Sequence, residues 1–323
     1  MGCTRLSIGL LCLTWLTVIA PAAHVGVGVA PPPNFPELTP QEHDRAVAAL
    51  RALATTLADG RGLTLSDTDA APLLIYSDWP KGDVPALRAQ LSQAYREAAR
   101  RLGARRGQNV FAGRLLVLAL RDRETFGRVV EDLEAPLNTP DDLASFAGRS
   151  DGLAVVVLCR PEVATGQPDS GAARRELQHR WLSATTRVIC AAVVFRLHRP
   201  AGDPDGAAEL PPWLGRGLAT MIQHEIAPPR PHETQYVRDL ANVGNRIDLE
   251  LLFADELPAG PFIDAAAASV VRLLAQRDRS ALDGLLRRCR NGQRPEAALQ
   301  DTFGWDYEGL LTAWRKHLQT ARH

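Results

Sequence analysis

Lysine is nearly absent from this sequence, since Lys81 and Lys316 are the two lysines among 37 basic residues and the others are arginines. Aspartate and glutamate together also number 37, so the formal net charge is zero. A chain without net positive charge creates no long-range field that attracts nucleic acid. We therefore expect no nucleic-acid partner.

Several sequence motifs of common enzyme classes are missing as well. The chain has no glycine-rich phosphate loop, no Cys-x-x-Cys pair and no repeat at a fixed period. Cysteine is scarce, and after the first 22 residues it occurs only at Cys159, Cys190 and Cys289. These positions are too far apart for a metal motif and allow one internal disulfide at most. We interpret them as small, semi-buried apolar residues, with one disulfide as the alternative.

Long hydrophobic runs are limited to the N-terminus. The run from Leu6 to Ile19 has about 14 residues, fewer than the roughly 20 that a membrane-spanning helix needs. Arg5 precedes this run and Ala20-Pro21-Ala22 follows it as a small-residue cleavage site. Residues 1–22 therefore match a secretory signal peptide. We predict an exported protein, in the periplasm, the cell envelope or the medium, without a stable membrane span after cleavage; retention of the segment as an anchor is the alternative.

The folded region is predicted to begin after a linker at residues 23–39 that is rich in proline and glycine. Thr39-Pro40-Gln41-Glu42 is a capping box with proline at the first helical position. Apolar residues then recur at helical spacing and predict a helix from Pro40 to about Leu57.

A small β-sheet lobe is predicted over residues 40–160. The apolar runs 73–76, 115–120 and 153–158 are too short for helices and indicate buried strands. Helices are expected between them, one with its apolar face running from Leu87 to Leu102 and one at about 124–133.

A mainly helical lobe is predicted over residues 171–323. The segment from Ala172 to Leu197 indicates one long helix that is polar at its beginning and apolar all round in its later half. Further helices are expected within 261–275, around 282–286 and at about 307–320. The fold class is therefore α+β, a small sheet lobe with packed helices followed by a mainly helical lobe.

Two short segments carry the functional signal, Arg-Glu-Leu-Gln-His at 175–179 and Glu-Leu-Pro-Pro-Trp-Leu-Gly-Arg-Gly-Leu-Ala-Thr-Met-Ile at 209–222. In zinc peptidases, His-Glu-x-x-His places two histidine ligands on one helix face, and the glutamate deprotonates the zinc-bound water. Glu176 stands at the position of that base and His179 at the second ligand, whereas Arg175 replaces the first histidine.

The second segment resembles the Leu-Pro-x-Trp-Leu-x-Glu-Gly-Leu-Ala segment of the gluzincin peptidases, above all of the bacterial peptidase MA-like group. Arg216 stands where that group has its third zinc ligand. The tail is similar to that group's Phe-Gly…Trp ending, with Phe303, Gly304, Leu310, Trp314 and Leu318 at the matching positions. The resemblance extends from Leu73 to Leu318 and implies a gluzincin-like domain at 40–323.

The departures from the family pattern predict a protein without peptidase activity. Arginine stays protonated and offers no lone pair to a metal. With Arg175 and Arg216 at two ligand positions, we expect no metal and no cofactor. The alternative is an active zinc metallopeptidase in which Glu176 is the catalytic base and His179 is one ligand. If no metal binds, His179 is an ordinary helical histidine.

The resemblance implies that Arg175, Glu176, His179 and Arg216 border a peptide-sized cleft between two lobes. We predict that Arg216 pairs with Glu176 across this cleft, and that the remaining positive charge favours a carboxylate or another anion. The leading function is thus a non-catalytic binding or scaffolding module with a peptide or anionic ligand. The alternatives are the active metallopeptidase and a purely structural envelope protein.

Overall fold

The computed structural model describes residues 39–59, 68–70, 72–137, 142–149, 152–161, 171–198, 210–227, 235–236, 239–240, 249–253 and 260–320. The predicted signal peptide and linker lie outside these residues, apart from Thr39. Residues 31–323 form one unit. The order of elements along the chain is α1 (Pro40–Ala58), β1 (Thr68–Ala70), β2 (Leu73–Ser77), α2 (Val84–Arg101), β3 (Leu115–Leu120), α3 (Arg123–Asp132), β4 (Ala144–Gly148), β5 (Ala154–Cys159), α4 (Gly171–His198), α5 (Pro212–Ile226), α7 (Leu249–Phe253), α8 (Pro261–Arg277), α9 (Arg279–Arg290), α10 (Pro295–Phe303) and α11 (Tyr307–Thr320).

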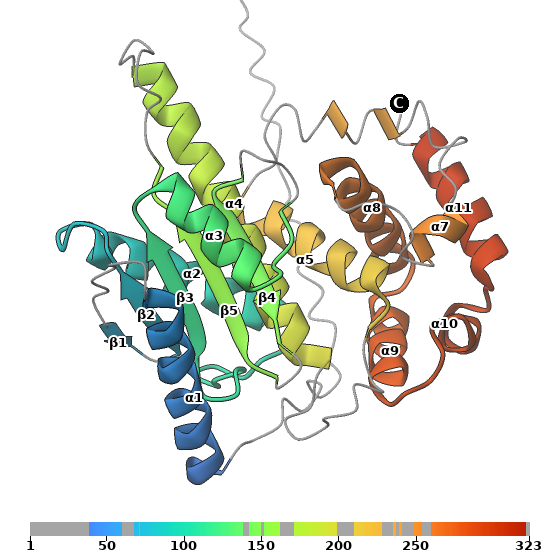
Figure 1. The fold of residues 1–323 in the computed structure, drawn as a ribbon. Coiled ribbons are helices and arrows are strands. Elements are labelled where there is room, and N and C mark those ends of the chain that lie inside the picture. Colours follow the sequence, from blue (N-terminus) through green and yellow to red (C-terminus); the bar gives the residue numbers. More distant parts are fainter. Residues whose placement is uncertain are drawn as a thin grey trace, which may run out of the picture. The chain divides into compact units, whose positions relative to one another are not determined.

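The sheet is mixed, with its strands in the order β1-β2-β3-β5-β4 (Figure 1). The three central strands β2, β3 and β5 run parallel, and both outer strands pair antiparallel to their neighbours. The predicted strands correspond to these three central ones. A helical C-terminal region follows the sheet, so the predicted α+β class is confirmed.

Helices cover both faces of the central strands, which explains why those strands are continuous apolar runs. Successive residues of each central strand point alternately into two hydrophobic cores. The first core combines Leu73, Ile75, Val117 and Val156 with residues of α2, α4, α5, α8 and α11, and the second combines Leu74, Leu116, Leu118 and Val155 with residues of α1 and α3. Since side chains alternate along a strand, the sheet separates the two cores.

The first helix begins as its sequence predicts. Thr39 Oγ1 accepts a hydrogen bond from Glu42 N–H (3.3 Å), and Glu42 Oε2 accepts from Thr39 N–H (2.8 Å), which completes the capping box. These two bonds satisfy backbone donors that a helix start would otherwise leave unpaired. The predicted and observed beginnings of α1 therefore coincide at Pro40.

Helices α4 and α5 pack against each other in opposite directions. Near the end of α5, Gln223 Nε2 donates to Ser183 Oγ (2.9 Å). Near its beginning, a Cβ placed on Gly215 lies 4.0 Å from Val194 Cγ1. The two helices are therefore antiparallel. The later half of α4 is buried, as its apolar sequence predicts.

The tail residues of the family resemblance have packing roles. Phe303, Leu310, Trp314 and Leu318 are buried in the first core. Trp314 Nε1 donates to Ser269 Oγ of α8 (3.1 Å), which satisfies the one polar group of a fully buried indole. Gly304 ends α10 in the left-handed conformation, with φ at 70°, which a glycine adopts without a steric penalty.

Strands β1 and β4 and the short helices α7 and α10 are not individually predicted by the sequence patterns. Strand β1 has three residues and β4 consists of Ala-Ser-Phe-Ala-Gly, so neither has a run of β-branched residues. Helix α10 follows Arg294 without a side-chain cap. Each is too short or too weakly patterned for periodicity to identify it.

The three cysteines are free and buried, so the alternative of an internal disulfide is not realised among them. In the part of the chain that the structure describes, no helix combines the length and the hydrophobicity needed to cross a membrane.

Candidate functional site

The predicted remnant of the zinc motif lies at the start of α4. Arg175, Glu176 and His179 are all exposed. Figure 1 shows these first turns of α4 extending beyond the ends of the strands. The polar beginning of the helix thus faces solvent, whereas the sequence predicted that it lines a cleft.

Arg216 lies far from these residues. Its neighbour Gly215 packs beside Val194. Val194 is 18 residues after Glu176 on the same helix, which corresponds to roughly 27 Å at 1.5 Å per residue. An arginine side chain cannot span that distance. The predicted ion pair between Arg216 and Glu176 is therefore not formed, because the antiparallel register of the two helices separates its partners.

The described residues do not fit the zinc site that the resemblance implies. No group of three His, Cys, Asp or Glu side chains among them is arranged to hold a metal ion. His179 and Glu176 are solvent-exposed on one helix, and Arg216 is distant and carries no lone pair.

Arg216 instead borders a pocket of about 480 Å³ at the junction of β4, α4 and α5. The pocket is lined by the segment after α3 (Leu133, Glu134, Pro136), all five residues of β4, the later half of α4 (Arg187, Val188, Ala191, Val194, Phe195), α5 (Gly215, Arg216, Ala219, Thr220), Leu210 and Asp264. Of the four predicted site residues, the structure brings only Arg216 to this pocket.

Two hydrogen bonds at the ends of β4 show which of its backbone groups point toward β5 and which point away from it. Cys159 N–H donates to Leu143 C=O (2.8 Å) before the strand, and Arg149 N–H donates to Leu153 C=O (2.9 Å) after it. In an antiparallel pair, bonded and non-bonded residues alternate. Odd-numbered residues from 143 to 149 therefore direct their backbone groups toward β5, and even-numbered residues direct theirs away from it.

The free edge of β4 is thus formed by Ala144, Phe146 and Gly148. The carbonyl of Ala144 accepts a hydrogen bond from Arg187 Nη2 (3.4 Å). Within the described residues, the outward backbone groups of Phe146 and Gly148 make no hydrogen bond. An edge strand with free N–H and C=O groups is a template for pairing with another extended segment.

An aromatic pair forms the apolar wall beside this edge. The rings of Phe146 and Phe195 are 5.6 Å apart in an edge-to-face arrangement. A Cβ on Gly148 would lie 2.5 Å from Cε2 of Phe195, closer than two carbon atoms approach. Glycine at 148 therefore permits the Phe195 ring to lie against the strand.

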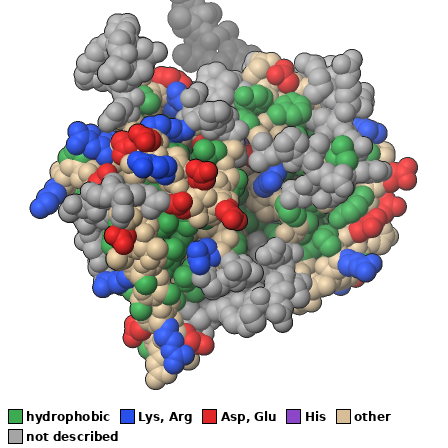
Figure 2. Space-filling view, in the orientation of Figure 1, with side chains coloured by type: hydrophobic (Ala, Val, Ile, Leu, Met, Phe, Trp, Pro, Cys, Tyr) green, Lys and Arg blue, Asp and Glu red, His purple; other side chains and the backbone are tan. Residues whose placement is uncertain are grey.

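Positive and negative side chains at the pocket largely balance one another. Arg187 pairs with Asp142 (3.1 Å), and both side chains are mostly buried, at 21 % and 17 % exposure. Arg216, Glu134 and Asp264 complete the charged lining. The face of the molecule in Figure 2 likewise has Lys and Arg interspersed with Asp and Glu.

Sequence reasoning missed most of this pocket. Arg216 was identified because it stands within a recognisable motif, whereas Phe146, Gly148, Arg187 and Phe195 belong to no motif. The available signal is indirect, since the later half of α4 is apolar all round and its sequence therefore predicts burial.

No protein-family model matches the chain, and no curated protein sequence is significantly similar to it.

Proposed function

We propose that this protein is an exported, non-catalytic binding module that holds an extended peptide along β4. The observation that carries the proposal is the free edge of Phe146 and Gly148 beside a pocket of about 480 Å³. A peptide strand added to a sheet edge gains affinity from main-chain hydrogen bonds and specificity from pockets that accept its alternate side chains.

The lining of the pocket defines the kind of peptide. Phe146, Phe195, Val188 and Leu210 supply an apolar surface for one side chain. Burying one large apolar side chain stabilises a complex by about 1.5–3 kcal/mol, and each net hydrogen bond adds about 0.5–1.5 kcal/mol. We expect a preference for an apolar residue in an otherwise extended, sequence-tolerant peptide.

The test is peptide selection with the mature protein, residues 23–323, from a random library of extended peptides. Affinities of enriched peptides are then measured by fluorescence anisotropy. Ala191→Leu fills the pocket from α4, and we expect it to raise Kd by about tenfold or more, the factor that corresponds to 1.4 kcal/mol. His179→Ala is the matched control on the same helix and should leave Kd unchanged.

Three outcomes contradict the proposal. Failure to enrich any peptide favours the purely structural alternative. Equal affinities of wild type and Ala191→Leu place the binding surface elsewhere. Near-stoichiometric zinc in protein purified without chelator, lost in His179→Ala, supports the metallopeptidase alternative with His179 as ligand and Glu176 as base.

A further inference from the structure

A second pocket of about 570 Å³ lies between the later turns of α2 and the loop that follows this helix. It shares no lining residue with the pocket at β4. Four arginines line it, Arg96, Arg100, Arg105 and Arg106, against one acidic residue, Glu97. Its floor includes the buried ring of Tyr95.

The loop presents Arg105 and Arg106 from a fixed turn. Gln108 N–H donates to Arg105 C=O (3.0 Å), and Arg105 N–H donates to Gln108 Oε1 (3.0 Å). Gly107, at the third position of this turn, has a φ of 81°. That geometry is typical of a type II turn, which requires a positive φ there.

Tyr95 attaches this turn to α2. Its hydroxyl donates to Gln108 C=O (3.0 Å) and accepts from Val110 N–H (3.1 Å). The backbone of Arg105 and Arg106 is therefore held near the helix before any ligand arrives, which reduces the ordering cost of binding.

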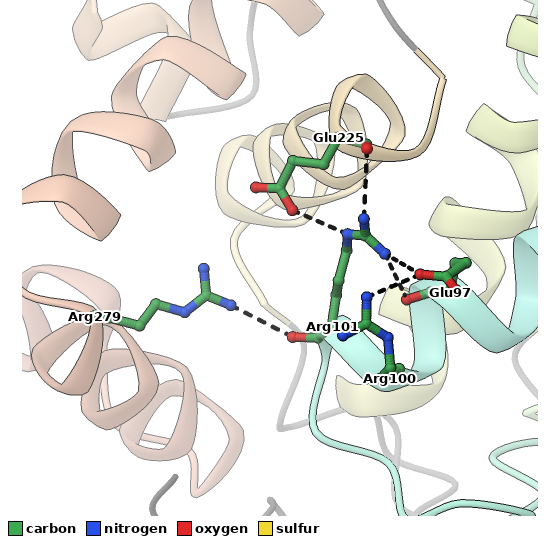
Figure 3. A network of polar contacts seen from close by, with 5 residues as sticks. All are labelled: Glu97, Arg100, Arg101, Glu225 and Arg279. Atoms are coloured by element: carbon green, nitrogen blue, oxygen red, sulfur yellow. Dashed lines mark hydrogen bonds and ion pairs between the residues drawn. The ribbon is translucent and has the colours of Figure 1, made fainter. Parts of the chain in front are cut away.

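The acidic residue of the pocket is already used. Glu97 Oε2 accepts hydrogen bonds from Arg100 (2.9 Å) and Arg101 (2.5 Å), as Figure 3 shows. Hydrogen bonds from Arg100, and to a lesser extent from Arg101, hold the pKa of Glu97 below its ordinary value. Glu97 therefore stays ionised and compensates α2 arginines rather than those of the loop.

The other three arginines of the pocket have uncompensated charge. The side chains of Arg96, Arg105 and Arg106 are exposed and make no hydrogen bond or ion pair with any described residue. The last turn of α9 also has a basic cluster, Arg287, Arg288 and Arg290. That cluster differs, because its Arg288 pairs with Asp301 at 2.9 Å.

We infer that this arginine pocket binds ligands that carry phosphate groups. The planar guanidinium fork matches phosphate oxygens and forms two parallel hydrogen bonds with them. The pocket lies at the C-terminal end of α2, whose carbonyl dipoles repel anions. The ligand therefore contacts the arginine side chains, and multiple negative charges are needed to balance at least three of them.

The same chemistry occurs in free polyphosphates and in the headgroups of anionic lipids. The probe for the first source is inorganic tripolyphosphate, titrated into the mature protein by calorimetry at low ionic strength. For the second source, vesicles containing phosphatidylglycerol are sedimented with the protein and compared with pure phosphatidylcholine vesicles. The variant is Arg105→Gln/Arg106→Gln. Its control is Arg45→Gln/Arg294→Gln, which removes the same charge from two exposed arginines outside the pocket.

We expect the pocket variant to lose about tenfold or more in affinity for its phosphate source, while the control loses less than about twofold. Loss with tripolyphosphate assigns a soluble ligand, and loss with anionic vesicles alone assigns a lipid headgroup. Equal losses in variant and control, or binding of neither probe by the wild type, overturns the inference. Matching thermal melts of all three proteins verify that the variants fold.

Discussion

At the scale of single residues, Arg101 is the polar centre of a contact between helices. Its guanidinium bonds to Glu97 on its own helix (2.5 Å) and to Glu225 on α5 (3.1 Å) (Figure 3). Its carbonyl accepts from Arg279 on α9 (3.4 Å). The Arg101 side chain is 21 % exposed, so solvent screens these pairs only in part.

Arg101→Gln should therefore lower the free energy of unfolding by about 1–2 kcal/mol, since two carboxylates lose their shared partner. Arg100→Gln is the matched control. Arg100 bonds to the same Glu97 (2.9 Å) but is 67 % exposed, and its loss should cost less than about 0.5 kcal/mol. Urea denaturation measures both values. Equal effects of the two variants would show that the contact with Glu225 contributes nothing.

At the scale of elements, the packing of α5 on α8 depends on one glycine. A Cβ on Gly217 would lie 2.4 Å from the carbonyl oxygen of Ala267 and 2.6 Å from Cγ2 of Val271. The obstructing carbonyl belongs to helix backbone and cannot move aside alone. Gly217 thus sets how closely the two helices approach.

Gly217→Ala should destabilise the protein by about 1–3 kcal/mol, the range for overpacking a close-packed interior. Gly215→Ala is the control two residues earlier on α5, where the nearest atom to a new Cβ is 4.0 Å away. That change should stabilise the protein by about 0.5–1 kcal/mol, because alanine favours a helix interior over glycine. Thermal melts of both variants test the sign. A neutral Gly217→Ala would mean that α8 shifts freely against α5.

At the scale of the whole molecule, the two predicted lobes share one core. The first core unites Val117 of the sheet with Val193 of α4, Leu218 of α5, Val270 of α8 and Trp314 of α11. Residues 40–160 and 171–323 therefore contribute to the same buried surface. The second core lies within residues 40–160, but the first core joins both segments.

We accordingly expect a single unfolding transition for residues 23–323. Tryptophan fluorescence and far-ultraviolet circular dichroism should report the same denaturation midpoint, the criterion of two-state behaviour. Trp79 and Trp181, with ring centroids 5.4 Å apart, report on the sheet side, and Trp213 and Trp314 report on the helical side. Separate midpoints would show that the lobes unfold independently.

Local chemistry in the sequence was sufficient for most elements of this fold. The capping box at Thr39 and Glu42 defined the start of α1 from backbone donors and acceptors within one turn. Continuous apolar runs identified the three central strands, since those strands are buried on both faces. The apolar later half of α4 likewise predicted its burial.

Tertiary structure alone decided the candidate site. Helical periodicity gives the faces of α4 and α5 but not how far one slides along the other, and that offset places Arg216 near Val194 rather than near Glu176. Strand β4 exists because β5 offers it a pairing edge, since its own small residues have little β-propensity. The sequence by itself determined most of the helices, the three central strands and their burial, because those properties depend on neighbours within a few residues. The pockets at β4 and beside Arg105 depend on side chains distant in sequence, so only packing brings them together.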